Sequence, residues 1–366
     1  MSSLVLNTRA GSRVSEAQTR GSHHCMDKTT MNLPRKFFFI ILTVLALVIC
    51  AWIGFEWWTF LKTPLVANNG SPVSFVFAQG TSVKKAAYSL KQQNLLKRPL
   101  FFVLFVRLSG VEYTLKAGEY VIEPGATAYK LIQKMAKGDS LRHAFTLVEG
   151  WNFSQVIAAL NDNKYIKHTV QKLSTTEIME KIGHSGEMPE GRFAPDTYLF
   201  SGEITDVDIL LNAYSLMQKR LQAAWDTRAK NIPYHCPYEA LIVASLIEKE
   251  TAFTQEKPLI ADVILRRLEK GMLLQVDPTV IYGLGSRFSG KLKKTDFLIN
   301  TPYNTYKHKG LPPTPIAMPG KDSIEAALHP VTGTAWYYVA KGDGTHKFSD
   351  SLKEQGKGIR KYLKGR

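Results

Sequence analysis

The longest apolar run of the sequence lies near its beginning, from Phe37 to Phe55, and it contains no charged residue. A helix of about 20 apolar residues crosses the hydrocarbon core of a bilayer. Tryptophans, which favour the membrane–water interface, gather toward the C-terminal end of the run at Trp52, Trp57 and Trp58. The pattern predicts an uncleaved transmembrane helix over 37–55. A cleaved signal peptide is the alternative, but the run is long for one and no small-residue cleavage site precedes Glu56.

The charges before this helix predict its orientation. Basic residues outnumber acidic ones over 1–36, and this polar segment has few residues that could build a core, so we expect it to be disordered. Positive charge favours the cytoplasmic side of a membrane helix. Residues 1–36 should therefore form a cytoplasmic tail, and the chain after Glu56 should lie across the membrane.

Between Ser74 and about Asn163 one polar and apolar pattern recurs three times. Each copy has a short apolar run, a glycine turn and an amphipathic helical stretch. Short polar side chains at the helix starts can accept hydrogen bonds from the free N–H groups of the first turn. The expected caps are Ser82, Thr127 and Asn152. A further helix over Pro99–Leu108 is nearly all apolar, and we expect it to be buried.

Longer helical patterns follow in the second half of the chain. An amphipathic helix is predicted over Val207–Trp225, and another amphipathic run covers Ala261–Leu268. The segment Pro237–Glu250 has no internal Gly or Pro and opens with the proline that a first helical turn accepts. Near the end, two aromatic segments around Tyr338 and Phe348 flank a glycine-rich turn, which predicts two paired strands.

Two glutamates end the Pro237–Glu250 helix in different surroundings. On helical spacing Glu250 shares a face with Leu246 and Ile247, so it ends an apolar face. A carboxyl desolvated by aliphatic side chains has its neutral form favoured and its pKa raised, as a general acid requires near neutral pH. The alternative is that Glu250 and Glu248 are both solvated at the helix end beside Lys249.

Polar side chains cluster downstream of this helix, in segments punctuated by Gly and Pro. These segments, Leu274–Gly283 and Thr301–Tyr306, are expected to be loops. Their Tyr, Asn, Gln, Asp and Thr side chains offer stacking faces and hydrogen bonds, which suit sugars as well as other polar ligands.

Composition and charge narrow the function only slightly. The chain has 366 residues, 45% of them hydrophobic, and a formal net charge of +16, so it has room for more than one domain. The charge invites a nucleic-acid partner, but no helix-turn-helix, zinc spacing or aromatic RNA-binding motif is present. An anionic wall polymer or membrane surface is an equally good partner.

Cys236 is the one cysteine after the membrane helix, so no disulfide is expected in that part of the chain. His235 lies beside it without other metal-binding residues nearby in the sequence, so no zinc site is predicted.

Four motifs follow one another at close spacing: EKET at 248–251, LQVDPTVIYG at 274–283, YNTY at 303–306 and GLPPTPI at 310–316. In this order they resemble the endolytic murein transglycosylase family, also called YceG-like or MltG. PDTY at 195–198 and the C-terminal aromatic hairpin agree with the family's pattern. Arg192, Ala194 and the segment Glu354–Gly356 depart from it. The strand–helix modules loosely resemble the LysM-like region of this family, which is associated with glycan binding.

The resemblance implies a membrane-anchored lytic transglycosylase. Such an enzyme cleaves the MurNAc-β-1,4-GlcNAc bond within nascent peptidoglycan strands and leaves 1,6-anhydroMurNAc ends, which would end glycan elongation. Matching EKET position by position makes Glu250 the catalytic acid and base. The candidates for holding sugars or orienting Glu250 are Gln275, Asp277, Tyr303, Asn304 and Tyr306. These side chains could equally pin their loops to the core.

The same resemblance implies no metal and no organic cofactor. The expected partners are peptidoglycan glycan strands and the cell-wall synthases of the elongation or division complex, with no nucleic acid. The protein would be a single-pass protein of the inner (plasma) membrane with a periplasmic catalytic domain.

The expected fold class is α+β. After the tail over 1–36 and the membrane helix over 37–55, we expect a LysM-like glycan-binding region over 56–163 and a transglycosylase catalytic domain over 164–366. Two other functions stay open. One is a non-catalytic, membrane-anchored peptidoglycan-binding or scaffold protein, and the other is a hydrolytic muramidase with Asp277 as its second carboxylate.

Overall fold

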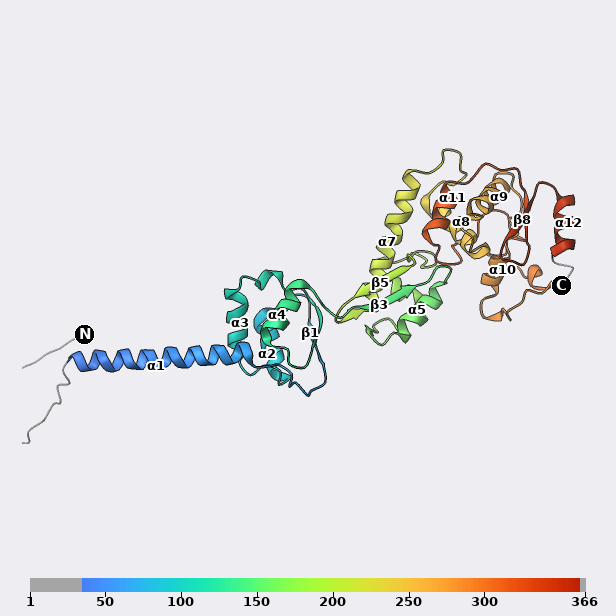
Figure 1. Ribbon diagram of the computed structural model, residues 1–366. Coiled ribbons are helices and arrows are strands. Elements are labelled where there is room, and N and C mark those ends of the chain that lie inside the picture. Colours follow the sequence, from blue (N-terminus) through green and yellow to red (C-terminus); the bar gives the residue numbers. More distant parts are fainter. Residues whose placement is uncertain (1–34, 363–366) are drawn as a thin grey trace, which may run out of the picture. The chain divides into compact units, whose positions relative to one another are not determined.

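The computed structural model describes residues 35–362 and shows a mixed α/β protein (Figure 1). The chain divides into two compact units, one ending at Thr59 and the other beginning at Phe60, and each is described separately. The predicted cytoplasmic tail lies outside the described residues, except for positions 35 and 36, which are already helical.

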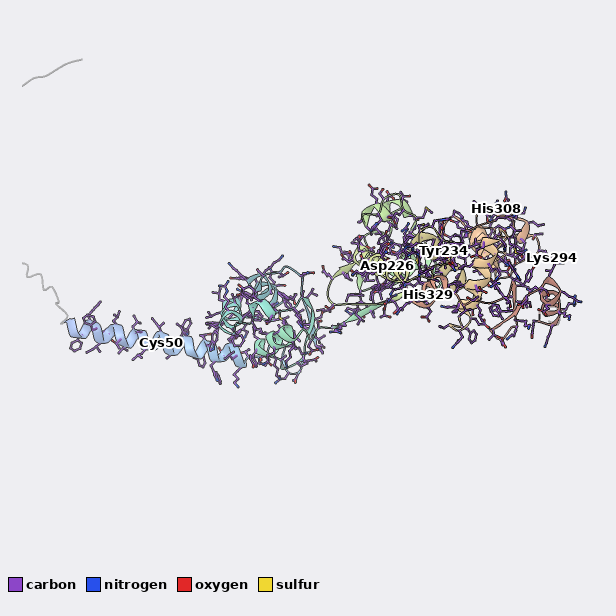
Figure 2. The ribbon with its side chains drawn as sticks, turned by 90° about the horizontal axis from the view of Figure 1, so that it is seen from above. Cys50, Asp226, Tyr234, Lys294, His308 and His329 are labelled. Atoms are coloured by element: carbon purple, nitrogen blue, oxygen red, sulfur yellow. The ribbon has the colours of Figure 1, made fainter. Side chains whose placement is uncertain are left out.

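Helix α1 (Arg35–Lys62) carries the long apolar run. Among the described residues, Phe37–Lys62 is the one helical segment long and apolar enough to cross a membrane. The helix continues past its predicted end at Phe55, because the residues up to Lys62 include no Gly or Pro that would stop it. Cys50 lies on α1 (Figure 2) and is a free cysteine, as is Cys236.

The residues that follow α1 form a small α/β core. Strands β1 and β2 pair antiparallel, with Val73 opposite Ile122. Phe75, Phe102 and Tyr120 are buried at the centre of this core. Its elements are β1 (Val73–Phe77), α2 (Val83–Gln92), α3 (Pro99–Leu108), η1 (Glu112–Thr114), β2 (Gly118–Ile122) and α4 (Ala128–Lys137).

The predicted helix caps are confirmed. The Ser82 hydroxyl accepts a hydrogen bond from the backbone N–H of Lys85 at the start of α2. Thr127 does the same for α4. Asn152 forms a full capping box with Gln155 at the start of α5 (Phe153–Asp162). These side chains satisfy N–H groups that have no partner within the helix, so they fix where each helix begins.

Helix α3 has the predicted bounds, but the expectation that it is buried is wrong for one of its faces, which is exposed. Phe102 and Val106 are fully buried, whereas Leu100 is 69% and Leu108 is 73% exposed. Apolar composition all around a helix predicts burial on all sides. This short helix follows α2 and packs against it, and no other described element covers its outer leucines, so they remain exposed.

The middle of the chain joins two short sheets to a long helix. Strand β3 pairs antiparallel with β5, and β4 pairs parallel with β6. Phe193, Leu210 and Ala213 are fully buried where α7 packs against this layer. The elements are β3 (His143–Leu147), α5, β4 (Ile166–Lys167), α6 (Thr175–Lys181), β5 (Asp196–Phe200), β6 (Ile204–Thr205) and α7 (Asp206–Asp226).

The C-terminal part is built around helix α8 (Pro237–Glu250). Every residue from Ala240 to Ile247 is buried, and α7, α9, α10 and α11 all pack against α8. The paired strands predicted near the end are confirmed as the antiparallel hairpin β7–β8. The further elements are α9 (Lys257–Glu269), α10 (Asp277–Leu284), η2 (Gly285–Arg287), η3 (Asp296–Leu298), α11 (Lys321–Leu328), β7 (Tyr337–Ala340), β8 (His346–Ser349) and α12 (Leu352–Tyr362).

The three predicted strand–helix modules do not share one sheet. The first two contribute β1 and β2, which pair with each other. The third contributes β3, which pairs with β5. Sequence recurrence therefore predicted the elements correctly, while the strand pairing depends on contacts between distant segments.

Candidate active site

Helix α8 carries both glutamates of the EKET motif at its C-terminal end. Pro237 occupies the first turn, where its missing N–H costs no hydrogen bond. The helix ends at Glu250, and the next residue, Thr251, has an extended backbone. Because the middle of α8 is buried on all sides, its last turn is held rigidly at the point where the helix reaches the surface.

Glu248 is a structural residue. Its carboxylate lies 3.2 Å from the ammonium of Lys257, and both side chains are almost completely buried. The same carboxylate oxygen accepts hydrogen bonds from the Gly320 N–H at 3.0 Å and the Ser323 hydroxyl at 2.6 Å. Glu248 thus joins α8 to the starts of α9 and α11 through one carboxylate oxygen that has three partners within the protein.

Glu250 has a different environment. It is partly exposed, yet the surrounding protein desolvates its carboxyl group, and this together with the nearby charge of Asp277 raises its pKa to about 8. The Tyr338 hydroxyl and the Arg267 guanidinium oppose the rise. A carboxyl with this pKa is mostly protonated at neutral pH, so Glu250 can donate a proton there.

Gln275 and Asp277 reach the site from the segment between α9 and α10. The backbone of Gln275 has φ of 55°, a left-handed conformation that non-glycine residues seldom adopt and that clusters at functional sites. Its N–H donates to the Thr305 carbonyl at 3.1 Å. Asp277 begins helix α10. The prediction that Leu274–Gly283 is a loop is therefore wrong from Asp277 onward, where Pro278 takes a first-turn position and opens a helix.

Arg267 is a site residue that the sequence did not reveal. It is buried, and its guanidinium donates to the carbonyl oxygens of Trp336 at 2.9 Å and Leu274 at 2.7 Å. It also reaches the Gln275 side-chain oxygen at 3.4 Å. Burial lowers the pKa of Arg267, and the Glu250 carboxylate acts in the opposite direction. Arg267 therefore fixes the segment before Asp277 and places a positive charge near Glu250.

Two tyrosines complete the surroundings of Glu250. The Tyr306 hydroxyl donates to an Asp277 carboxylate oxygen at 2.5 Å, and burial raises the pKa of Tyr306. The Tyr338 hydroxyl is buried and has no partner in hydrogen-bond geometry within residues 35–362. It nevertheless lies near enough to Glu250 to lower the pKa of that carboxyl. Glu250, Asp277, Tyr306, Arg267 and Tyr338 thus form one electrostatic cluster.

The remaining candidates lie apart from this cluster or within the core. Asn304 is 1% exposed, and its amide group donates to the carbonyls of Phe297 and Ile299, so it holds its own loop. The Tyr303 hydroxyl bonds to Thr314 at 2.9 Å, and its ring lies 4.7 Å from that of Tyr282. For Tyr303 and Asn304 the geometry therefore favours the alternative that these side chains hold their loop in place.

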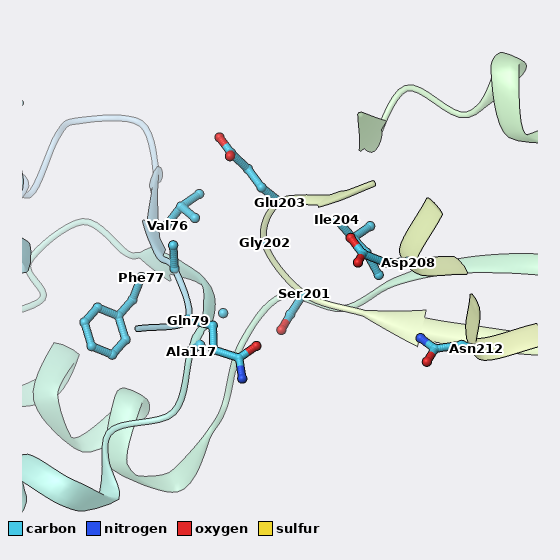
Figure 3. A pocket seen from close by; sticks show the side chains of 12 residues that line it. Val76, Phe77, Gln79, Ala117, Ser201, Gly202, Glu203, Ile204, Asp208 and Asn212 are labelled. Carbon is cyan, nitrogen blue, oxygen red and sulfur yellow. The ribbon is translucent and has the colours of Figure 1, made fainter. Parts of the chain in front are cut away.

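The pocket shown in Figure 3 and the histidine of the C-terminal hairpin add no second catalytic candidate. A pocket of about 440 Å³ near the turn between β5 and β6 (Figure 3) is lined by none of the predicted site residues. His346 in the C-terminal hairpin is buried, and its Nδ1 lies 2.8 Å from a Glu256 carboxylate oxygen. Within residues 35–362 no group of three His, Cys, Asp or Glu side chains could hold a metal ion.

The chain as a whole is similar to known proteins. The sequence profile of the YceG-like family matches residues 75–361. A protein named endolytic murein transglycosylase from Bacillus subtilis (strain 168) is 32% identical over 321 residues, which covers 83% of this chain and 88% of the relative. A protein of the same name from Streptococcus pneumoniae (strain D39) is 27% identical, and the match covers 78% of this chain and 57% of that longer protein.

One solved structure is also similar. It is the crystal structure of a putative YceG-like protein, lmo1499, from Listeria monocytogenes. The match has 24% sequence identity and a TM-score of 0.47, and it covers 78% of this chain and 99% of that chain.

Proposed function

Because this chain belongs to the YceG-like family, we propose that it is an endolytic lytic transglycosylase that cleaves MurNAc-β-1,4-GlcNAc bonds in peptidoglycan. The names of its relatives support this activity. The observation that carries the assignment to particular residues is Glu250, whose pKa is raised to about 8 at the rigid end of a buried helix.

The reaction needs a single carboxyl group that serves twice. Glu250 first donates its proton to the glycosidic oxygen, and the bond between that oxygen and the anomeric carbon breaks. The MurNAc 6-hydroxyl oxygen then bonds to the anomeric carbon, while the Glu250 carboxylate takes the hydroxyl proton. The product is a 1,6-anhydro sugar, no water is consumed, and Glu250 ends as it began. An ordinary glycosidase needs a second carboxyl to activate water or to act as a nucleophile.

The neighbours of Glu250 suit these two roles. Burial and the Asp277 charge favour the protonated form before cleavage. The Arg267 charge and the Tyr338 hydroxyl favour the carboxylate that exists between the two proton transfers. The Asp277 carboxylate, positioned by Tyr306, would stabilise the positive charge that develops at the anomeric carbon. Gln275 remains a candidate for a hydrogen bond to the sugar.

We also propose roles for helix α1 and for the small α/β core that follows it. Helix α1 would anchor the protein in the plasma membrane with its N-terminus in the cytoplasm and the part beginning at Phe60 in the periplasm. The small core of β1, β2 and α2–α4 would act as a LysM-like glycan-binding region within the predicted 56–163 segment. Synthases that make the glycan strands would be partners of such an enzyme.

End-group analysis of the products tests the reaction directly. Uncrosslinked glycan strands are incubated with the full chain, treated with borohydride and examined by mass spectrometry. Anhydro ends that resist reduction would support transglycosylation. New reducing MurNAc ends would instead support the muramidase alternative, in which Asp277 activates water. Binding without any product would support the scaffold alternative.

A further inference from the structure

A second pocket adjoins the Glu250 site without including any residue of its electrostatic cluster. It has a volume of about 720 Å³, within the range of small-molecule sites. Lys249 and Pro278 line it, and these are the immediate chain neighbours of Glu250 and Asp277. Ile281 also lines the pocket and lies one turn after Asp277 on the same face of α10, so a ligand in this pocket would lie close to one bound at Glu250.

The pocket contains a buried carboxyl group that the proposed reaction does not use. Glu190 is 5% exposed. Its oxygens accept hydrogen bonds from the Phe153 N–H at 3.0 and 3.3 Å and from the Tyr282 hydroxyl at 3.0 Å, and the Gly191 N–H also contributes. Burial raises the pKa of Glu190 to about 7. These contacts come from three donors, because the single Phe153 N–H is shared between both oxygens. A carboxylate can accept about four hydrogen bonds, so one acceptor position is left for a ligand.

The rest of the lining suits a sugar ring. Tyr282 and Phe288 provide aromatic surface, and Ile281 and Ile316 provide aliphatic surface. A pyranose ring has apolar C–H faces that pack on such groups, while its hydroxyl and acetamido groups need hydrogen-bond partners such as Glu190.

Lys249 adds a positive charge at the rim. Its ammonium donates to the Gly150 carbonyl at 3.0 Å. An ammonium has three N–H donors, so two remain for a carboxylate, such as one on a peptide attached to MurNAc.

We propose that this pocket is a second saccharide subsite, which binds an N-acetylhexosamine residue next to the one at Glu250. Glu190 accepts a hydrogen bond from that sugar, and Lys249 pairs with a carboxylate of the attached peptide. The inference rests on the proposed function, because an enzyme that cuts inside a glycan strand must hold sugars on both sides of the broken bond.

A steric block tests the pocket without disturbing the core. Ser154 lines the pocket and is exposed, so Ser154→Trp fills the space while leaving helix α5 folded. The control is Ala158→Trp, since Ala158 is exposed on the same helix and does not line the pocket. Both changes are made in the full chain carrying Glu250→Gln, so that the probe is not consumed. The probe is a GlcNAc–MurNAc octasaccharide with its peptides.

We expect Ser154→Trp to weaken binding of this octasaccharide by at least about tenfold and Ala158→Trp to leave it unchanged, as measured by calorimetry. Glu190→Gln keeps the size of the side chain and should weaken binding several-fold. Lys249→Ala should weaken binding of the octasaccharide but not of the same sugar without peptides. Unchanged binding by the Ser154→Trp chain would overturn the proposal.

Failure of the subsite and failure of the proposed function give different results. If the chain with native Glu250 releases anhydro ends and Ser154→Trp does not affect binding, the reaction stands and the subsite is wrong. If no anhydro ends form but Ser154→Trp still weakens binding, the pocket is a saccharide site and the reaction is wrong.

Discussion

Two glutamates separated by one residue at the end of α8 have different roles, one structural and one proposed to be catalytic. Glu248 is closed in by Lys257, Gly320 and Ser323, whereas Glu250 is partly exposed and has a raised pKa. The helical periodicity correctly placed Glu250 at the end of an apolar face. It could not identify Glu248 as the more tightly held residue, because the partners of Glu248 come from segments far along the chain.

The interactions of Glu248 predict that its replacement lowers the free energy of unfolding substantially. Glu248→Gln removes one partner of a buried ion pair and leaves Lys257 without compensation, which typically costs about 3–5 kcal/mol. Glu250→Gln should change the free energy of unfolding by no more than about 1 kcal/mol, since Glu250 has no comparable ion pair. Urea denaturation of the two variants measures the difference. Equal losses of stability would contradict these assignments.

The environment of Glu250 predicts the pH dependence of activity. A general acid must be protonated to act, so kcat/KM should fall as the pH rises through about 8, the pKa of Glu250. The Tyr338 hydroxyl lowers this pKa, so Tyr338→Phe should raise it and move the falling limb to higher pH. Tyr337→Phe is the control, because the Tyr337 hydroxyl is not among the groups that shift Glu250. A limb that moves to lower pH in the Tyr338→Phe chain would contradict this account.

At the scale of secondary structure, the sequence predicted the helices with unambiguous local signals and missed a helix whose local signals also fit a loop. Helices α3 and α8 have the predicted bounds because prolines mark their first turns. Helix α10 was expected to be a loop, although it too has a proline in its first turn, since its glycines and polar residues also fit a loop. Strand β5, which contains the last three residues of the PDTY motif, was not predicted, because it is ordered by pairing with the distant strand β3.

Arg267 shows why part of the site could not be predicted. Nothing local distinguishes it from Arg266 beside it. In the folded chain, Arg266 pairs with Asp262 one turn earlier, while Arg267 points inward to the carbonyls of Trp336 and Leu274. Those two carbonyls belong to segments whose positions follow only from the complete fold.

The difference between the two arginines gives a matched pair of variants. Arg267→Lys keeps the charge but cannot reproduce the several directed N–H bonds of a guanidinium, so the segment carrying Gln275 and Asp277 should shift. Because small displacements of catalytic groups are costly, we expect kcat to fall by about 10- to 100-fold. Arg266→Lys should leave kcat within about threefold of the parent. Similar losses in both variants would show that Arg267 has no special positioning role.

At the scale of the whole molecule, the family resemblance predicted from four short motifs is confirmed by the match over residues 75–361. The motifs cover only a small part of this length. They were informative because their order and spacing agree, and each supplies residues that the fold brings to the surroundings of α8.

Because α1 is long and apolar, we expect the protein to remain bound to membranes at high salt concentration. A basic chain held only by charge should be released from membranes at about 1 M salt, where screening acts over about 3 Å. A spanning helix remains, because its apolar side chains lie in the hydrocarbon core. Fractionation after high-salt and carbonate washes distinguishes the two, and we expect the full chain to stay in the membrane. Release by salt alone would contradict anchoring by α1.

The most direct test of the account compares the two glutamates of EKET in one assay. The full chain, Glu250→Gln and Glu248→Gln are incubated with uncrosslinked glycan strands at a temperature where all three are folded, and the anhydro ends are counted by mass spectrometry. We expect the parent and Glu248→Gln to produce anhydro ends and Glu250→Gln to lose activity by at least about 10²-fold. Anhydro ends from the Glu250→Gln chain at the parent's rate would contradict the assignment of Glu250 as the catalytic acid and base.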